Sequence, residues 1–151
     1  MLEPETLMQI ALEEARLALD TGDVPVGAVI VDGSGSVVAK GRNEREATKD
    51  PTAHAEIVAI RRAANQLQSW QLNEHTLVVT LEPCAMCAGA ILASRIPRVI
   101  FAAWDEKAGA SGSVHDLLRD RRLPHRVEVL GGILEAESQT LLREFFEARR
   151  S

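Results

Sequence analysis

Hydrophobic and polar positions along this chain follow two periods, one typical of helices and one typical of strands. Apolar residues recur every three or four positions over residues 5–20, which predicts an amphipathic helix that ends at Thr21-Gly22. Residues 24–31 and 37–41 are rich in β-branched side chains and flank the turn residues 32–35, which predicts a hairpin. The first quarter of the chain is therefore expected to form a helix followed by two antiparallel strands.

The remaining residues predict strands and helices in alternation. Asp50-Pro51 is typical of a helix start, with Asp as N-cap and Pro in the first turn, and the helix is expected to reach Leu67. Pro83 marks another start, before a small apolar helix. The further expected elements are strands at 76–81, 98–103 and 127–130, helices at 84–94, near 114–118 and at 134–149, and a loop at 105–115. This alternation predicts an α/β fold, in which helices cover both faces of a partly parallel sheet.

Length and charge limit the class of protein. The 151 residues, 46% of them hydrophobic, suit a single domain over 1–151. No apolar run approaches the roughly 18 residues of a membrane span and no basic leader opens the chain, so a cytoplasmic protein without membrane association is expected. The net charge of −5 argues against a uniformly basic nucleic-acid-binding surface. Arginines 119, 121, 122 and 126 leave a local basic patch possible in the second half.

Four residues at the two proline-marked helix starts carry candidate metal chemistry. His54 and Glu56 form H-x-E, and Cys84 and Cys87 form P-C-x-x-C with Pro83. Cysteines three positions apart on a helix share a face, and the free N–H groups of the first turn favour thiolates. The imidazole of His54 would complete three ligands. Zinc suits this donor set, and three protein ligands leave one tetrahedral position for water, as in catalytic sites.

Two other interpretations of the cysteines, a structural zinc site and a redox dithiol, have less support in the sequence. A structural zinc needs a fourth protein ligand, yet the chain has no third cysteine, and His75, His115 and His125 lie far from the motif in sequence. A thioredoxin-like dithiol would leave the H-x-E motif unexplained. A non-catalytic, zinc-stabilised binding module stays open as an alternative from a different class of protein.

Glu56 is the candidate proton carrier. On a helix its side chain would point roughly 200° away from that of His54, but in a first turn beside an ion it can still reach the bound solvent. Zinc lowers the pKa of a bound water from about 15.7 to about 7, and a placed acid/base adds about 10²- to 10⁴-fold in rate. Glu56 is therefore predicted to accept and return a proton without binding the metal.

These motifs resemble the zinc-dependent nucleoside and nucleic-acid deaminases, whose signature is H-x-E followed by P-C-x-x-C. Further stretches resemble the bacterial tRNA adenosine deaminase branch of these enzymes, and together they extend over nearly the whole chain. The similar stretches are residues 24–28, 50–56, 80–90, 94–96, 109–113, 125–127 and 145–146. Trp104 and Ala108, which flank Asp105, depart from the residues often found there.

The resemblance implies a three-layer α/β/α cytidine-deaminase-like fold with a mixed sheet of about five strands, and a homodimer with one Zn²⁺ per subunit. It implies hydrolytic conversion of adenosine to inosine at the wobble position of a tRNA anticodon, in an arginine tRNA. His54, Cys84 and Cys87 would be the ligands and Glu56 the proton shuttle. The nearest alternative is deamination of a free nucleobase or nucleoside, such as guanine or cytosine, by the same zinc chemistry.

Residues that contact the substrate follow from the same resemblance. Asn43 is expected to contact the extruded nucleotide, and Asp105 its ribose or backbone. Each residue also has a structural alternative. Asn43 would cap the end of the hairpin, and Asp105 would be an ordinary turn residue. The expected contacts to flanking nucleotides are Lys107, Ser111, His125 and Phe146. An aromatic ring such as that of Phe146 is otherwise typical of a core.

Overall fold

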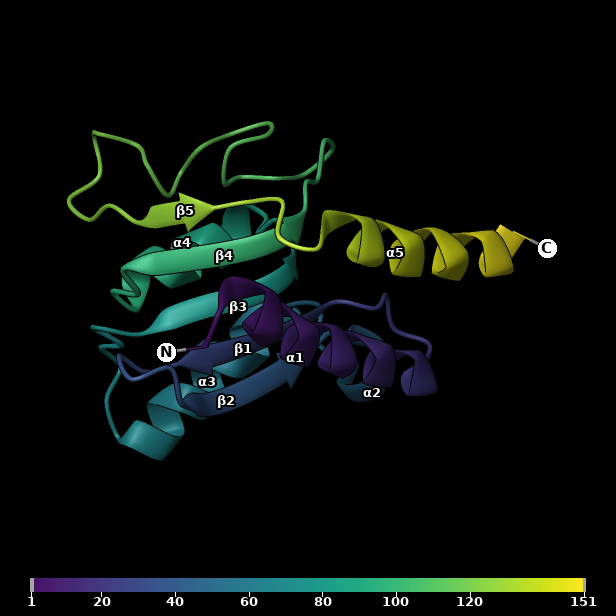
Figure 1. Cartoon of the computed structure of the whole chain (residues 1–151), viewed down its shortest axis with the longest axis horizontal. Coiled ribbons are helices and arrows are strands. Elements are labelled where there is room, and N and C mark those ends of the chain that lie inside the picture. Colours follow the sequence, from purple (N-terminus) through teal and green to yellow (C-terminus); the bar gives the residue numbers. More distant parts are fainter. Residues whose placement is uncertain (1, 151) are drawn as a thin grey trace.

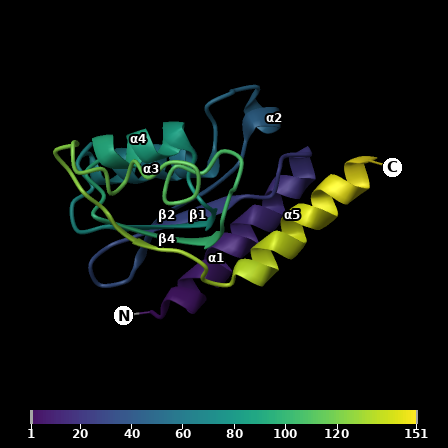
Figure 2. The same cartoon turned by 90° about the horizontal axis from the view of Figure 1, so that it is seen from above.

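The computed structural model describes residues 2–150 and contains a five-stranded sheet between two layers of helices (Figures 1 and 2). Helices α1 (Pro4–Leu17) and α5 (Glu135–Arg150) cover one face of the sheet. Helices α3 (Ala55–Leu67) and α4 (Ala85–Ala93) cover the other face. The three-layer α/β/α architecture expected from the sequence is confirmed.

The sheet is mixed and runs in the order β2-β1-β3-β4-β5. Its strands are β1 (Gly27–Val31), β2 (Val37–Arg42), β3 (Thr76–Leu81), β4 (Arg98–Ala103) and β5 (Glu128–Leu130). Strand β1 is antiparallel to β2 and β3, whereas β3, β4 and β5 are mutually parallel. The start of β1 therefore lies at the same edge of the sheet as the ends of β2, β3 and β4.

Central strands are buried on both faces because successive side chains point to opposite sides. Ile30, Val79 and Phe101 belong to the core cluster that also contains residues of α3 and α4. Their sequence neighbours Val29, Val78 and Ile100 belong to a second cluster with α1. This double burial explains why the strands are continuous apolar runs.

Helix α3 approaches β2 closely where Gly41 lies. A Cβ atom on Gly41 would lie 2.5 Å from the carbonyl oxygen of Ala55 and 2.6 Å from the backbone nitrogen of Ala59. These separations are shorter than carbon–oxygen or carbon–nitrogen contacts allow, so only glycine fits. The contact fixes the first turn of α3 against the end of β2.

The expectation that this helix begins at Asp50-Pro51 is wrong, because α3 begins at Ala55. The Asp50 carboxylate instead accepts hydrogen bonds at 2.8 Å from both the backbone N–H and the hydroxyl of Thr52. Aspartate favours such local turns as readily as it caps helices. The Asp-Pro pair therefore shapes the turn that leads to the helix rather than the helix start itself.

Two shorter segments also differ from expectation. Residues 114–118 form turns and an isolated bridge between Ser111 and Asp116 rather than a helix. A four-residue helix that the sequence pattern did not predict, α2 (Arg45–Thr48), follows β2. The backbone N–H groups of Glu46 and Ala47 in this helix donate to the carboxylate of Asp23 at 2.6 and 3.2 Å, a partner more than twenty residues away. A single turn of 3₁₀ helix, η1 (Ala18–Thr21), extends α1.

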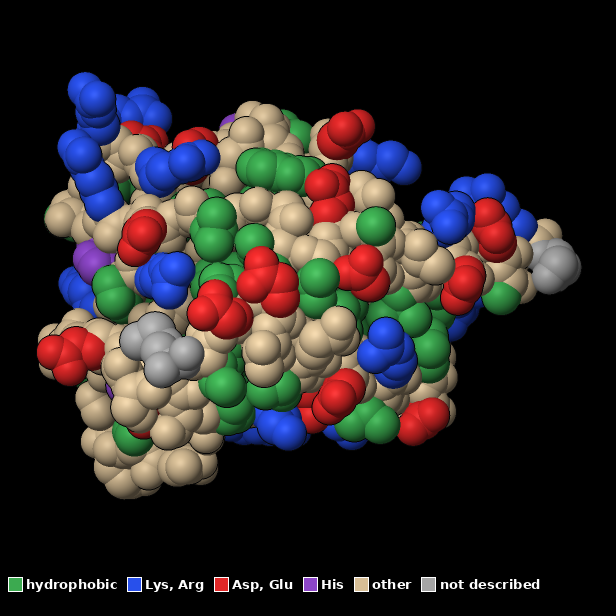
Figure 3. All heavy atoms as spheres, in the orientation of Figure 1, with side chains coloured by type: hydrophobic (Ala, Val, Ile, Leu, Met, Phe, Trp, Pro, Cys, Tyr) green, Lys and Arg blue, Asp and Glu red, His purple; other side chains and the backbone are tan. Residues whose placement is uncertain are grey.

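Charged side chains are unevenly distributed over the surface. On the face shown in Figure 3, Lys and Arg side chains gather over the connection between β4 and β5. Exposed arginines of this connection are Arg119, Arg121, Arg122 and Arg126. Two of them form ion pairs within the connection, to Asp116 and Asp120, which reduces the net positive charge of the patch. No helix within residues 2–150 is apolar over a length that would cross a bilayer.

Candidate metal centre and active-site pocket

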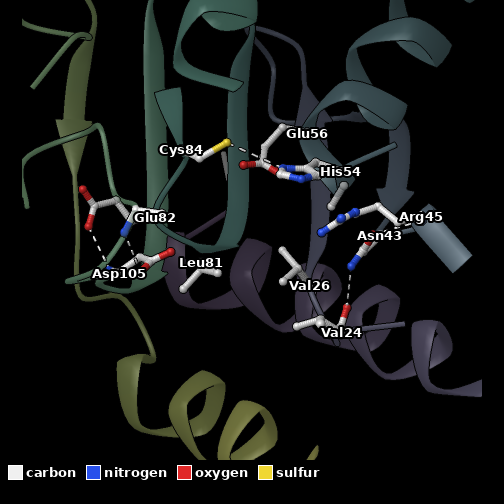
Figure 4. Close-up of a pocket in the computed structure, with 12 residues that line it drawn as sticks. Val24, Val26, Asn43, Arg45, His54, Glu56, Leu81, Glu82, Cys84 and Asp105 are labelled. Carbon is white, nitrogen blue, oxygen red and sulfur yellow. Dashed lines mark hydrogen bonds between the residues drawn. The ribbon is translucent and has the colours of Figure 1, made fainter. Parts of the chain in front are cut away.

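Two of the predicted ligands occupy equivalent positions at helix starts. His54 is the N-cap of α3 and Cys84 is the N-cap of α4, and both have extended backbone conformations. Their carbonyl oxygens accept the first helical hydrogen bonds, from Val58 at 3.0 Å and from Ala88 at 2.8 Å. The side chains are consequently free to project from the helix ends toward each other (Figure 4).

The three predicted ligands converge on one point. Nδ1 of His54 lies 3.6 Å from Sγ of Cys84 and 3.5 Å from Sγ of Cys87. Zinc–sulfur bonds near 2.3 Å and zinc–nitrogen bonds near 2.0 Å at tetrahedral angles require a sulfur–nitrogen separation of about 3.5 Å. Within residues 2–150 this is the one group of His, Cys, Asp and Glu atoms close enough to hold a metal. The donor set and its spacing fit zinc.

Proton sharing within this cluster favours a thiolate at Cys84. Hydrogen bonds from Cys87 and His54 lower the pKa of Cys84 to about 3. The same hydrogen bond to Cys84, together with burial, raises the pKa of Cys87, and contact with Cys84 also raises the pKa of His54. Because thiolates and neutral imidazoles are the metal-binding forms, a dication would displace the remaining protons.

Glu56 lies in the first turn of α3 and is 4% exposed. Its carboxyl group is seen beside the imidazole of His54 in Figure 4. The expected angle of roughly 200° between the two side chains does not apply, because His54 precedes the helix and has an extended backbone. Burial raises the pKa of Glu56 to about 7. A carboxyl group with such a pKa can accept and release protons at neutral pH.

The cluster borders a cavity of about 190 Å³ at the edge of the sheet where β1 starts and β2, β3 and β4 end. His54, Glu56 and Cys84 belong to its lining. Apolar walls come from Val24, Val26, Leu81 and Ala108. An apolar cavity with a few convergent polar groups is typical of a site for a small planar ligand.

Both residues expected to contact the extruded nucleotide line this cavity. Asn43 donates to the carbonyl of Val24 at 3.2 Å and accepts from the backbone N–H of Arg45 at 3.1 Å, which leaves a second amide hydrogen unused. Asp105 accepts from the backbone N–H groups of Lys107 and Ala108, both through Oδ1 at 3.1 Å. The alternative roles, a cap and a turn residue, are thus fulfilled by one part of each side chain.

The other four predicted contact residues lie outside the cavity lining. Lys107 is exposed, Ser111 is fully buried, and His125 is half-buried with Nε2 3.2 Å from the carbonyl oxygen of Ile96. Phe146 is 45% exposed on α5 and borders a neighbouring groove, whose lining includes Val24 and Asn43. Phe146 thus shares a groove with residues of the cavity lining, and none of the four lines the cavity itself.

Two charged residues of the cavity lining, Arg45 and Glu82, were not predicted from the sequence. Arg45 is exposed and lies on α2, the short helix that the pattern did not predict. Glu82 directly precedes the Pro-Cys pair, but its carboxylate bonds to residues 23 to 31 positions away. The only sequence signal for Glu82 is an acidic residue at the end of a buried strand.

The fold and the metal centre together define a class of zinc enzymes. Residues 1–103 match the model of the cytidine and deoxycytidylate deaminase zinc-binding region. This match covers more than half of the chain and includes His54, Cys84 and Cys87. The chain therefore belongs to the cytidine and deoxycytidylate deaminase family.

Similar proteins narrow the position of the chain within this family. It is 47% identical to the tRNA-specific adenosine deaminase of Haemophilus influenzae, over 97% of this chain and 84% of that protein. It is 43% identical to the enzyme of the same name from Bacillus subtilis, over 99% of this chain and 92% of that protein. These relatives place the chain in the tRNA-specific adenosine deaminase branch.

Solved structures show the same similarity. A structure from a study of A-to-I editing by tRNA:A34 deaminases at the wobble position has a TM-score of 0.86 and 42% identity, and the match covers 91% of this chain and 99% of that one. A guanine deaminase from Nitrosomonas europaea has a TM-score of 0.84 at 25% identity, with 96% and 85% covered. The same fold thus serves deaminases with different substrates.

Replacement of His54 by alanine tests the ligand set. We expect the purified His54→Ala protein to retain less than about a tenth of the zinc of the unaltered chain, because two thiolates alone bind the ion weakly. Elemental analysis of zinc per chain is the measurement. The matched control is His115→Ala, which removes an exposed histidine and should leave zinc content unchanged. Full zinc occupancy in His54→Ala would refute the assignment.

Proposed function

We propose that this protein hydrolyses adenosine to inosine at the wobble position of a tRNA anticodon, in an arginine tRNA. The proposal includes one Zn²⁺ per subunit and action in the cytoplasm, where the tRNA pool lies. One observation carries the chemistry: a buried carboxyl group, Glu56, adjoins three convergent zinc-type ligands at an apolar cavity. The similarity to enzymes named tRNA-specific adenosine deaminases supports the substrate.

Glu56 is proposed to carry protons between the nucleophile and the base. A zinc ion held by His54, Cys84 and Cys87 supplies, when bound, a water that is acidic enough to act as a nucleophile at neutral pH. Glu56 would accept a proton from this water and deliver it to N1 of adenine. It would then take the proton of the new C6 hydroxyl group and pass it to the amine, which leaves as ammonia while the C6 carbonyl forms. The apolar walls of the cavity exclude other water, which strengthens these polar interactions.

The lining suggests how a nucleotide would be held. The unused amide hydrogen of Asn43 and the Oδ2 atom of Asp105, which has no hydrogen-bond partner within residues 2–150, are available to polar groups of the nucleotide. Arg45 places a cation at the cavity, suited to a backbone phosphate. Phe146 on the neighbouring groove offers a ring for a flanking base. The roles of Lys107, Ser111 and His125 stay predictions.

Deamination of a free nucleobase is the second candidate function. The structural similarity to a guanine deaminase, at a TM-score of 0.84, favours it, because one fold can serve different substrates. A base within an RNA must leave its stack at a cost of a few kcal/mol, which is smallest in a single-stranded loop. An anticodon loop meets this requirement, and a free base needs no such opening.

Substrate competition separates the two functions. We expect the zinc-loaded protein to form inosine in an anticodon stem-loop that carries adenosine at the wobble position, and to leave free adenosine, cytidine and guanine unchanged. Liquid chromatography of the digested RNA and of the free compounds is the measurement. A stem-loop with guanosine at the wobble position is the matched control and should yield no inosine. Turnover of guanine with an inert stem-loop would establish the second candidate instead.

Glu56→Gln tests the proton carrier. We expect kcat to fall by about 10²- to 10⁴-fold, the usual contribution of a placed acid/base, with the folded structure and zinc content retained. Single-turnover deamination and zinc analysis are the measurements. Glu13→Gln, the same change at an exposed position on α1, should behave as the unaltered chain. Undiminished deamination by Glu56→Gln would show that Glu56 is not the proton carrier. A different result, in which the unaltered protein binds the stem-loop but never deaminates it, would favour a non-catalytic binding module.

A homodimer is also proposed, with helix α4 at its interface. The helix contains no charged residue, and its exposed positions are Ala85, Met86, Gly89 and Ala93. An uncharged helix face with one exposed methionine and three small residues is unusual on a solvent-exposed surface and permits close packing against a symmetry-related copy.

Gly89→Glu tests this interface. A Cβ atom on Gly89 has no neighbour within 4 Å, so the isolated chain accommodates a larger side chain, whereas a buried interface would not. We expect the unaltered protein to sediment at about twice 16.4 kDa and Gly89→Glu at about 16.4 kDa. Leu17→Glu, a charge at an exposed apolar position of α1, is the control. Equal masses for both variants and the unaltered protein would argue against α4 as the interface.

A further inference from the structure

Glu82 is a buried carboxylate that takes no part in the ligand set or in the proton transfer described above. It is 2% exposed. Backbone N–H groups of Asp105, Ser111 and Ser113 donate to it at 2.9, 3.0 and 2.9 Å, and the hydroxyl of Ser113 donates as well. A buried carboxylate is tolerated only when donors replace its lost water. Four donors from one segment satisfy this requirement.

The segment that supplies these donors, residues 105–113, is seated on the residues that lead into α4. The backbone N–H of Ala110 donates to the carbonyl of Pro83 at 2.8 Å, and Gly109 pairs with Cys84 in an isolated bridge. A Cβ atom on Gly109 would lie 2.4 Å from Cδ and 2.5 Å from Oε1 of Glu82. Only glycine allows the segment to approach the carboxylate this closely.

This segment forms one wall of the cavity through Asp105 and Ala108. It contains no helix or strand, so repetitive backbone hydrogen bonds do not determine its shape. The segment is held mainly by its bonds to Glu82 and to the neighbouring backbone. Figure 4 shows Glu82 and Asp105 together on the side of the cavity opposite Asn43 and Arg45.

We propose that Glu82 is a positioning residue for the substrate: its carboxylate fixes the 105–113 segment so that Asp105 faces the bound nucleotide. This inference rests on the proposed function for its substrate. Glu82 acts through Asp105, because its carboxylate bonds to the 105–113 segment and, among the described residues, to none of the ligands His54, Cys84 and Cys87. Loss of the charge is therefore expected to affect substrate binding more than the chemical step.

Glu82→Gln in the full, zinc-loaded chain is the test. Glutamine has the same shape, but its NH₂ group faces N–H donors that then lack an acceptor, so the 105–113 segment should loosen. We expect KM for the anticodon stem-loop to rise about tenfold, with kcat within about threefold and zinc content unchanged. Hydrogen exchange should accelerate at the amides of Asp105, Ser111 and Ser113. Glu82→Asp, which keeps the charge, should recover part of the exchange protection.

A double-substitution cycle separates positioning from a general structural role. Asp105→Asn alone should raise KM without faster exchange at Ser111 and Ser113. If Glu82 acts through Asp105, the double variant should have a KM close to that of Asp105→Asn, whereas independent effects would multiply. Multiplying effects, an unchanged KM in Glu82→Gln, or loss of its zinc would overturn the proposal.

The exchange experiment keeps this inference distinct from the proposed function. If the unaltered protein deaminates no anticodon stem-loop, the proposed function fails. Faster hydrogen exchange in Glu82→Gln with zinc retained would still support the conclusion that Glu82 fixes the 105–113 segment. Unchanged exchange would overturn that conclusion whatever the substrate. Glu13→Gln, with its exposed side chain on α1, is the matched control and should change neither exchange nor KM.

Discussion

The candidate site depends on one constraint: the ends of several strands and the starts of two helices lie together at a single edge of the mixed sheet. Because β1 is antiparallel to β2 and β3, its first residue lies beside the last residues of both strands. Helices α3 and α4 start at the same edge, with His54 and Cys84 as their N-caps. The positions at which two helices begin therefore determine where the metal ligands lie. The close contact of Gly41 with α3 fixes one of these helix starts.

Three acidic side chains are buried among residues 2–150, and their surroundings separate their roles. The carboxylates of Asp23 and Glu82 each accept hydrogen bonds from at least two backbone N–H groups, and both hold a neighbouring segment in place. For Glu56, by contrast, loss of water is the largest influence, and it raises the pKa to about 7. Donors stabilise an anion, whereas desolvation makes proton uptake easy. The physical distinction between the two anchors and the proposed proton carrier thus lies in the number of donors around each carboxylate.

Sequence patterns predicted the parts of this fold whose causes are local. The central strands β1, β3 and β4 are apolar runs because they are buried on both faces, and the spacing of Cys84 and Cys87 places two sulfurs on one side of a helix start. The sequence pattern failed where a residue far away in the sequence determines the local structure, or where one local signal fits two structures. Helix α2 depends on the carboxylate of Asp23, and the turn at Asp50 uses the same local chemistry as a helix cap. The surroundings of Glu82 could not be predicted for the same reason, because its hydrogen-bond donors lie in the connection between β4 and β5.

The walls of the cavity bear on how this fold distinguishes substrates. A guanine deaminase shares the fold at a TM-score of 0.84 with only 25% identity, so the sheet and helix starts do not select the base. Selection then depends on the side chains that line the cavity. In this chain two lining segments lie outside the sheet and the ligand-bearing helices α3 and α4, namely α2 on one side and the 105–113 segment on the other. Each donates backbone N–H groups to one buried carboxylate, Asp23 or Glu82, so the position of both walls depends on anchors that are separate from the three metal ligands.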